Sequence, residues 1–136
     1  MGRIMGLDLG DVRVGIAISD ESRFLASGYG FVEYRGYNDL IKKIINIARK
    51  EEVDKIVVGL PLNMDGSKGP QAAKAEKIAL LLKQKSGLAA NLIDERLSTV
   101  EASRQLHAGG KKAQKGLVDM VSATVILQAF LDGQKD

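Results

Sequence analysis

Hydrophobic positions recur along this chain at two spacings, and the change from one spacing to the other predicts the order of its secondary structure. Alternating or unbroken apolar residues predict five strands, at residues 3–9, 12–19, 25–34, 54–60 and 89–93. Apolar residues at helical spacing predict helices at residues 38–51, from Pro70 to Gly87, and at about 116–131. Asn38 is the predicted N-cap of the first helix, and a capping box at residues 98–101 predicts a further short helix.

The connections between these elements predict how the strands pair. Gly10 and Asp11 form a tight turn, which predicts an antiparallel hairpin of the first two strands. A meander followed by strand–helix–strand crossovers predicts an α/β fold. Its mixed five-stranded sheet would contain a three-strand antiparallel meander and two parallel strands, with helices on both faces. We expect one domain over residues 1–136, with its functional site beyond the carboxyl ends of the parallel strands.

Three acidic residues occupy positions where a buried apolar residue is expected. Asp8 shares a strand face with Ile4 and Gly6, although aspartate is disfavoured within strands. Glu95 directly follows the apolar end of the fifth strand, and Asp119 lies on the apolar stripe of the last helix. A buried carboxylate without a partner costs free energy or shifts its pKa until it is neutral. Three such residues suggest one shared partner, and Mg²⁺ or Mn²⁺ is the candidate.

Each of these acids also has a simpler explanation. Asp8 could hydrogen-bond to the hairpin turn, and Asp119 could interact with the dipole of its helix N-terminus. Glu95 could pair with Arg96, or Asp94 could be the functional carboxylate instead, because strand alternation puts the two on opposite faces. The residues alone do not decide whether Asp94 or Glu95 is the functional carboxylate, although the longer side chain beyond the strand end favours Glu95.

The basic residues indicate a nucleic-acid partner. The net charge of +3 is small, but three lysines cluster in a glycine-bounded stretch just before Asp119, a composition that suits a phosphate backbone. An arginine within the second strand and a lysine near the start of the second helix could also contact phosphate. The predicted nucleic-acid-binding residues are Arg13, Lys68, Lys111, Lys112 and Lys115. A solvated basic loop and an exposed strand face are the alternatives.

The composition excludes several other kinds of site. The chain has no cysteine and one histidine, which excludes disulfides and thiolate metal sites and disfavours a Ser-His-Asp triad. It contains neither a P-loop nor a dinucleotide-binding fingerprint. No apolar run is expected to cross a membrane, and nothing marks the N-terminus for export. We therefore expect a cytoplasmic protein with no membrane partner.

Four ordered motifs carry a family resemblance that spans nearly the whole chain. They are GLDLG with RVGIAISD, VVGLPLNMDGS, DERLST, and VD leading into SATVILQ. Together they resemble the YqgF family, the Holliday-junction-resolvase-like and pre-16S rRNA-processing nucleases of bacteria. Ser122 and Thr124 stand where that family often has alanine, a departure that concerns helix packing.

The resemblance implies a ribonuclease-H-like fold related to RuvC resolvases. It implies that Asp8, Glu95 and Asp119 are metal-binding catalytic carboxylates, which favours Glu95 over Asp94. Such an enzyme would hydrolyse phosphodiester bonds of structured nucleic acid with one or two Mg²⁺ or Mn²⁺ ions. Processing of the 5′ end of the 16S rRNA precursor is the first expectation. Resolution of Holliday junctions in DNA is the second, because it usually requires a symmetric dimer, and we expect a monomer or weak dimer.

Two readings outside the nuclease class stay open. The hairpin segment Asp8-Leu9-Gly10 is also similar to the first phosphate loop of actin-like phosphotransferases. Those proteins close two lobes around a nucleotide, and 136 residues supply only one. The other reading is a non-catalytic nucleic-acid-binding module, against which the presence of all three acids argues.

Overall fold

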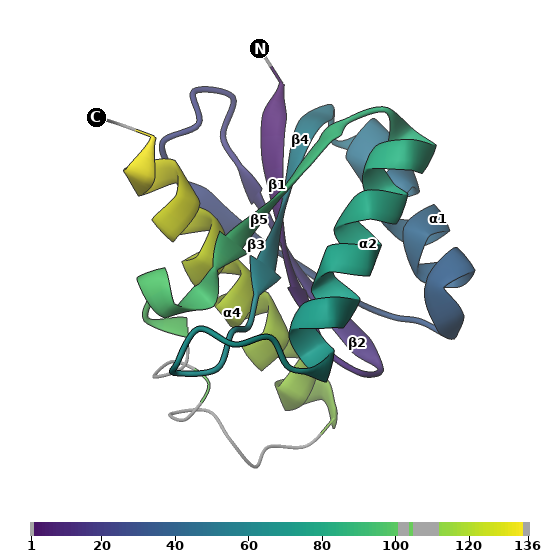
Figure 1. Cartoon of the computed structure of the whole chain (residues 1–136). Helices are drawn as coiled ribbons and strands as arrows, with labels where there is room; N and C mark the ends of the chain where they lie inside the picture. Colours follow the sequence, from purple (N-terminus) through teal and green to yellow (C-terminus); the bar gives the residue numbers. More distant parts are fainter. Residues whose placement is uncertain (1, 101–103, 105–111, 135–136) are drawn as a thin grey trace.

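The chain folds around one mixed sheet, in a computed structural model that describes residues 2–100, 104 and 112–134 (Figure 1). The strands of this sheet are β1 (Arg3–Leu9), β2 (Arg13–Ser19), β3 (Ala26–Glu33), β4 (Val53–Leu60) and β5 (Ala89–Asp94). They lie in the order β3-β2-β1-β4-β5, antiparallel from β3 to β1 and parallel from β1 to β5. The predicted mixed five-stranded sheet is confirmed.

Helices cover both faces of the sheet, as predicted. α1 (Gly36–Lys50) and α2 (Pro70–Ser86) lie on one face, and α4 (Lys112–Gly133) lies on the other (Figure 1). The alternation along β1 serves both layers, because Leu7 packs into the core of α1 and α2 whereas Ile4 packs with Leu127 of α4. Asp8 shares the strand face of Ile4, so its side chain points toward α4.

Two glycines let α4 approach the sheet closely. A Cβ atom at Gly15 of β2 would lie 1.9 Å from the carbonyl oxygen of Asp119, and one at Gly6 of β1 would lie 2.7 Å from Cβ of Leu127. Both distances are shorter than real Cβ contacts, so a side chain at either position would push the helix away. The contact at Gly15 holds the backbone of Asp119 directly over β2.

The helix starts differ from the sequence prediction. α1 begins at Gly36, so the predicted N-cap Asn38 lies inside its first turn. Asp39 supplies the capping contact instead, because its Oδ2 accepts a hydrogen bond from the backbone nitrogen of Arg35 at 2.9 Å. α4 begins at Lys112, four residues before its predicted start. The short helix predicted from residues 98–101 lies largely outside the described residues.

α4 differs from the expectation that no apolar run is long enough to cross a membrane. By length and composition its segment Lys115–Gly133 could cross a bilayer, with a mean hydropathy of 1.3. In this fold one side of the helix is covered by the sheet, and Ala123, Leu127 and Leu131 are fully buried. Packing as one layer of the core therefore explains the apolar composition of α4.

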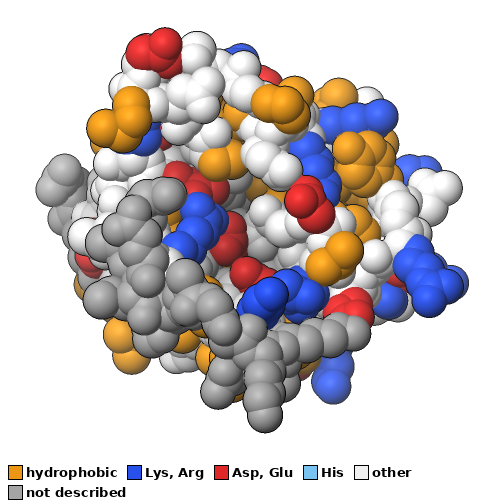
Figure 2. Space-filling view, turned by 90° about the horizontal axis from the view of Figure 1, so that it is seen from below, with side chains coloured by type: hydrophobic (Ala, Val, Ile, Leu, Met, Phe, Trp, Pro, Cys, Tyr) orange, Lys and Arg blue, Asp and Glu red, His pale blue; other side chains and the backbone are white. Residues whose placement is uncertain are grey.

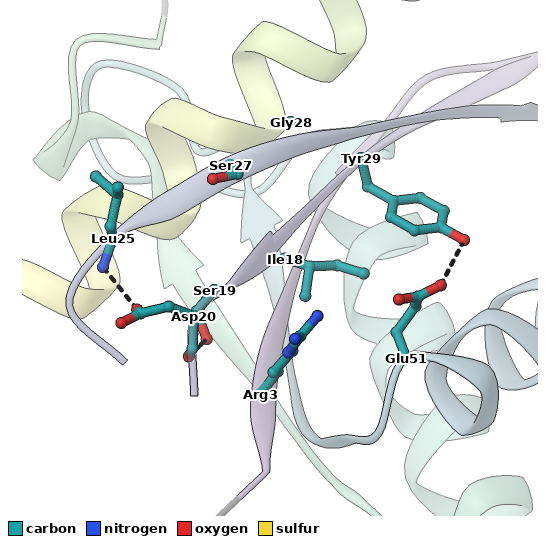
Figure 3. A pocket seen from close by; sticks show the side chains of 9 residues that line it. All are labelled: Arg3, Ile18, Ser19, Asp20, Leu25, Ser27, Gly28, Tyr29 and Glu51. Carbon is teal, nitrogen blue, oxygen red and sulfur yellow. Dashed lines mark hydrogen bonds between the residues drawn. The ribbon is translucent and has the colours of Figure 1, made fainter. Parts of the chain in front are cut away.

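A small pocket of about 260 Å³ lies at the end of the sheet where β1 begins and β2 ends (Figure 3). Arg3 and Ser19 line it, and two hydrogen bonds connect its walls. Tyr29 donates to Glu51 at 3.1 Å, and the backbone nitrogen of Leu25 donates to Asp20 at 3.0 Å. Because Asp8 lies at the other end of β1, this pocket is separate from the predicted carboxylate site.

Candidate active site

Asp8, Glu95 and Asp119 share one end of the fold. Asp8 is the next-to-last residue of β1, and Glu95 opens the 3₁₀ turn η1 (Glu95–Leu97) directly after β5. Because β1, β4 and β5 are parallel, their carboxyl ends meet at the same edge of the sheet. Asp119 reaches this edge from α4. The carboxylates predicted from distant parts of the sequence therefore lie in one neighbourhood.

Burial raises the pKa of two of these carboxylates, Asp8 and Asp119. The exposed fraction of Asp8 is 4%, and burial raises its pKa from 3.8 to about 7. Arg104 lowers the pKa of Asp8, whereas the negative charges of Glu95 and Asp119 raise it further. Burial also raises the pKa of Asp119, against the lowering effect of Arg13. The site concentrates negative charge where little water can screen it.

Two arginines hold the three carboxylates. Arg104 donates to Asp8 Oδ1 through Nη2, and its Nη1 lies 2.8 Å from Glu95 Oε1. Arg13 Nε donates to Asp119 Oδ2 at 3.3 Å. The planar guanidinium of Arg104 thus bridges one acid from β1 and one from η1. Arg13, predicted to contact nucleic acid, lies in this structure against a carboxylate.

Arg104 and Gly59 belong to this site, although they were not among the residues predicted from the sequence. Arg104 lies four residues after the fully buried Val100, so helical spacing could have placed it on the inward face. A Cβ at Gly59 of β4 would lie 2.8 Å from Glu95 Oε2 and 2.9 Å from Cδ1 of Ile126. Gly59 therefore makes room for the Glu95 carboxylate, a role that no local sequence signal indicates.

Asp94 and Glu95, which the residues alone could not separate, have different surroundings. Asp94 accepts hydrogen bonds from the Arg96 side chain, with Nη2 at 2.7 Å, and these bonds lower the pKa of Asp94. Its Oδ1 also accepts from the backbone nitrogen of Arg96 at 2.9 Å, so it caps η1. Glu95 is 8% exposed and lies beside Asp8 through Arg104.

The loop between β4 and α2 borders the same end of the sheet. Asn63 Nδ2 donates to Ser67 Oγ at 2.9 Å, and Asp65 Oδ1 accepts from the backbone nitrogen of Ser67 at 2.9 Å. These internal bonds show that the polar side chains of the loop form its turns. An open hollow of about 660 Å³ beside the loop is lined by residues 61–64, Glu95, Arg96 and Ser98.

The predicted basic residues differ in their surroundings. Lys68 Nζ lies 2.9 Å from Glu76 Oε2, and its side chain is 58% exposed. Lys115 is exposed near the start of α4, one turn before Asp119. Lys112 is the first residue of α4, and Lys111 lies outside the described residues. Figure 2 views this end of the molecule and shows acidic and basic side chains side by side in a hollow.

The carboxylate oxygens of the site suit a hard divalent cation. In this structure the guanidinium of Arg104 lies between two of the carboxylates. Mg²⁺ and Mn²⁺ take carboxylate oxygens as ligands. Among residues 2–100, 104 and 112–134, no three acidic or histidine side chains are grouped closely enough to hold one ion as they stand. Arg104 bridges Asp8 and Glu95 with a positive charge instead. The chemistry of these residues therefore fits a cation at the position of that charge.

Known proteins resemble this chain in sequence along nearly its whole length. Its residues 2–133 match the family described as RuvX, Holliday junction resolvase. A relative from Caldanaerobacter subterraneus subsp. tengcongensis is 40% identical over 98% of this chain and 99% of its own length. Another, from Anaeromyxobacter dehalogenans strain 2CP-C, is 46% identical over 96% of each chain. Both bear the name "Putative pre-16S rRNA nuclease".

Solved structures share the fold at low sequence identity. RuvC from T. thermophilus in complex with a Holliday junction substrate superposes with a TM-score of 0.61 at 10% identity, over 98% of this chain and 96% of that one. The Fowlpox virus resolvase superposes with a TM-score of 0.55 at 8% identity, over 98% and 99%. These likenesses place the sheet and its helices in the ribonuclease-H-like fold. By the match over residues 2–133, the chain belongs to the RuvX Holliday junction resolvase family.

Proposed function

We propose that this protein is a nuclease that hydrolyses phosphodiester bonds of structured nucleic acid with the help of a divalent cation. The observation that carries the proposal is the nearly buried pair of carboxylates, Asp8 and Glu95, which one guanidinium bridges. The negative charge of Asp119 also acts on Asp8 and raises its pKa. Membership of a family described as a resolvase, with relatives named as rRNA nucleases, supports it. Such a concentration of buried negative charge favours a bound cation, and a divalent cation can activate water and offset the charge that develops when a phosphodiester is cut.

The three acids would hold Mg²⁺ or Mn²⁺, and the fold would fix where they stand. A bound cation would lower the pKa of water and offset the charge that develops on the reacting phosphate. Asp8 is fixed by its strand. Glu95 is confined by the space over Gly59, and Asp119 cannot shift without moving the helix that touches Gly15. The protein thus supplies preorganised ligands and excludes water around Asp8.

The basic residues would position the nucleic-acid backbone without reading its sequence. The described part of the chain exposes the side chains of Lys68 and Lys115. Arg13 would contribute only if it exchanged Asp119 for a phosphate. Lys111 and Lys112 are further candidates, on the sequence alone. Exposed basic side chains suit phosphate groups, so nucleic acid is the partner we propose for this surface.

The 16S rRNA precursor is the proposed substrate, with cleavage that matures its 5′ end. The names of the relatives support this choice, and an rRNA substrate would place the protein in the cytoplasm. A four-way DNA junction is the second candidate, because the matching family is described as a Holliday junction resolvase. The two substrates differ enough to be separated in one assay.

Cleavage assays test the proposal. Wild-type protein, Asp8→Asn and the matched control Asp54→Asn are incubated with a 16S precursor transcript, a linear DNA duplex and a four-way DNA junction, each with Mg²⁺, Mn²⁺ or EDTA. Asp54 lies at the far end of the sheet, where it pairs with Arg23. We expect metal-dependent cutting of the transcript by the wild-type and control proteins and none by Asp8→Asn.

Each outcome assigns a function. Cutting of the junction alone would identify a resolvase. Equal cutting by Asp8→Asn and wild-type protein would remove the carboxylate site from the reaction. Binding without cutting, under every metal condition, would favour the non-catalytic module.

A further inference from the structure

Arg104 occupies the position that a cation on Asp8 and Glu95 would need. Its Nη2 pairs with Asp8 Oδ1, and its Nη1 lies 2.8 Å from Glu95 Oε1. The side chains of the two acids are 5% and 7% exposed, so solvent screens these charges weakly. One guanidinium therefore uses one oxygen of each carboxylate that the proposed function assigns to a metal ion.

A guanidinium and a divalent cation would exclude each other here. Two positive groups between the same buried carboxylates repel strongly, because the local dielectric constant is low. Removing either from the pair without a replacement leaves buried charge uncompensated, which is costly. The side chain of Arg104 is 31% exposed, so it has a route toward solvent. The guanidinium and the divalent cation would thus replace each other at the two carboxylates, because the departure of either one alone would leave buried charge unpaired.

We propose that Arg104 competes with the metal ion for Asp8 and Glu95, and that this competition sets the metal affinity of the protein when no nucleic acid is bound. The inference rests on the proposed function for the identity of the ligands. Arg104 is a positioning residue in this account: it keeps the two acids oriented and neutralised until a cation replaces it. Its rigid guanidinium fork directs separate N–H groups at the two carboxylate oxygens, a fixed geometry that an ammonium group lacks.

Mn²⁺ titration in the absence of nucleic acid tests the competition. The signal of free Mn²⁺ in electron paramagnetic resonance is followed for wild-type protein, Arg104→Gln and Arg104→Lys. We expect Arg104→Gln to bind Mn²⁺ about tenfold more tightly or better, because it removes hydrogen bonds of the charge-assisted kind. Arg104→Lys should lie between the two, since it keeps the charge and loses the fork.

Two controls separate this effect from a change in overall charge. Arg49→Gln removes the same charge from α1, on the face of the sheet opposite α4, and should leave the Mn²⁺ affinity unchanged. Combining Asp8→Asn with Arg104→Gln should abolish the gain, because one of the two ligands is then gone.

A folded Arg104→Gln variant that binds Mn²⁺ no more tightly than the wild-type protein would overturn the proposal. Circular dichroism checks the folding. If Arg104→Gln does not fold, Arg104→Lys decides, and an affinity equal to or below that of the wild-type protein has the same meaning. Cleavage is measured separately: gain of Mn²⁺ affinity without cleavage of any substrate would defeat the proposed function alone. Cleavage without the gain would defeat the competition alone.

Discussion

At the scale of single residues, Asp8 makes folding depend on pH. Burial raises its pKa from 3.8 to about 7, so the folded chain binds this proton more tightly than the unfolded chain does. Stability from this group is therefore complete below pH 4 and is lost as the pH rises through about 7. Above that pH the ionised carboxylate destabilises the fold unless a cation offsets it.

Asp8→Asn should raise the melting temperature by several degrees at about pH 8 in EDTA and change it little near pH 4. The amide keeps the shape of the side chain and carries no charge to bury. Mn²⁺ at the higher pH should raise the melting temperature of the wild-type protein and not that of the variant. Thermal unfolding followed by circular dichroism gives both results. Asp54→Asn changes a side chain that is 46% exposed and should not raise the melting temperature at either pH. A lower melting temperature for Asp8→Asn at about pH 8 would mean that Arg104 outweighs the effect of burial.

Gly59→Ala should disturb the position of the Glu95 carboxylate more than it lowers the free energy of unfolding. The added Cβ would lie 2.8 Å from Glu95 Oε2 and 2.9 Å from Cδ1 of the buried Ile126, and both atoms are the far ends of side chains that can move away. The loss of stability should therefore be modest, roughly 1–2 kcal/mol. The displaced carboxylate should weaken Mn²⁺ binding and lower cleavage by about tenfold or more. Urea unfolding and Mn²⁺ titration of the same preparation measure the two effects. A large loss of stability with unchanged Mn²⁺ affinity would contradict this account.

At the scale of elements, α4 is fixed by its contact with β2. The Cβ of a residue at position 15 would lie 1.9 Å from a backbone oxygen of α4, so the whole helix would have to move. Gly15→Ala should cost more than the roughly 1–3 kcal/mol typical of overpacking, and should displace Asp119. Gly133→Ala, with no atom within 4 Å of its Cβ, should leave stability unchanged or slightly higher. Chemical unfolding compares the two variants, and equal stability would show that α4 shifts at little cost.

The elements also show why most of this fold could be predicted from the sequence. The apolar runs of β1, β2 and β4 match their buried interiors, and the Gly10 turn favours the first hairpin, so local signals were sufficient for these strands. The start of α1 was wrong because Asn38 and Asp39 are both good capping residues. The helix begins two residues earlier, at Gly36, and Asp39 accepts the hydrogen bond from the backbone nitrogen of Arg35.

The site was predicted less completely, for a physical reason. Asp8 and Asp119 break apolar patterns within their own elements, so the sequence marks them. Arg104 and Gly59 matter through atoms that are distant in sequence: Arg104 bridges carboxylates from β1 and η1, and Gly59 clears space for Glu95. A pattern along one element carries no information about such contacts. The choice of Glu95 over Asp94 likewise came from the family resemblance and not from the local pattern. The structure shows Asp94 bound to Arg96.

At the scale of the whole molecule, the two ends of the sheet differ in chemistry. The carboxyl ends of β1, β4 and β5 gather Asp8, Glu95 and Arg104, whereas the end of β1 at Arg3 carries the small pocket of Figure 3 and the ion pair between Arg23 and Asp54. The net charge of +3 is too small to attract nucleic acid to every face equally. Binding should therefore be directed by where the charges lie.

Salt dependence of binding tests this directionality with two lysines. Lys115 is exposed at the site end of α4, and Lys85 is exposed at the last turn of α2, next to the start of β5 at the far end of the sheet. Loss of one phosphate contact should lower the slope of log affinity against log salt by about 0.7–0.9. We expect this change for Lys115→Gln and none for Lys85→Gln, measured by fluorescence anisotropy with a four-way DNA junction in EDTA. Equal changes in both variants would show that the protein attracts nucleic acid over its whole surface, and the site end would then have no privileged role in binding.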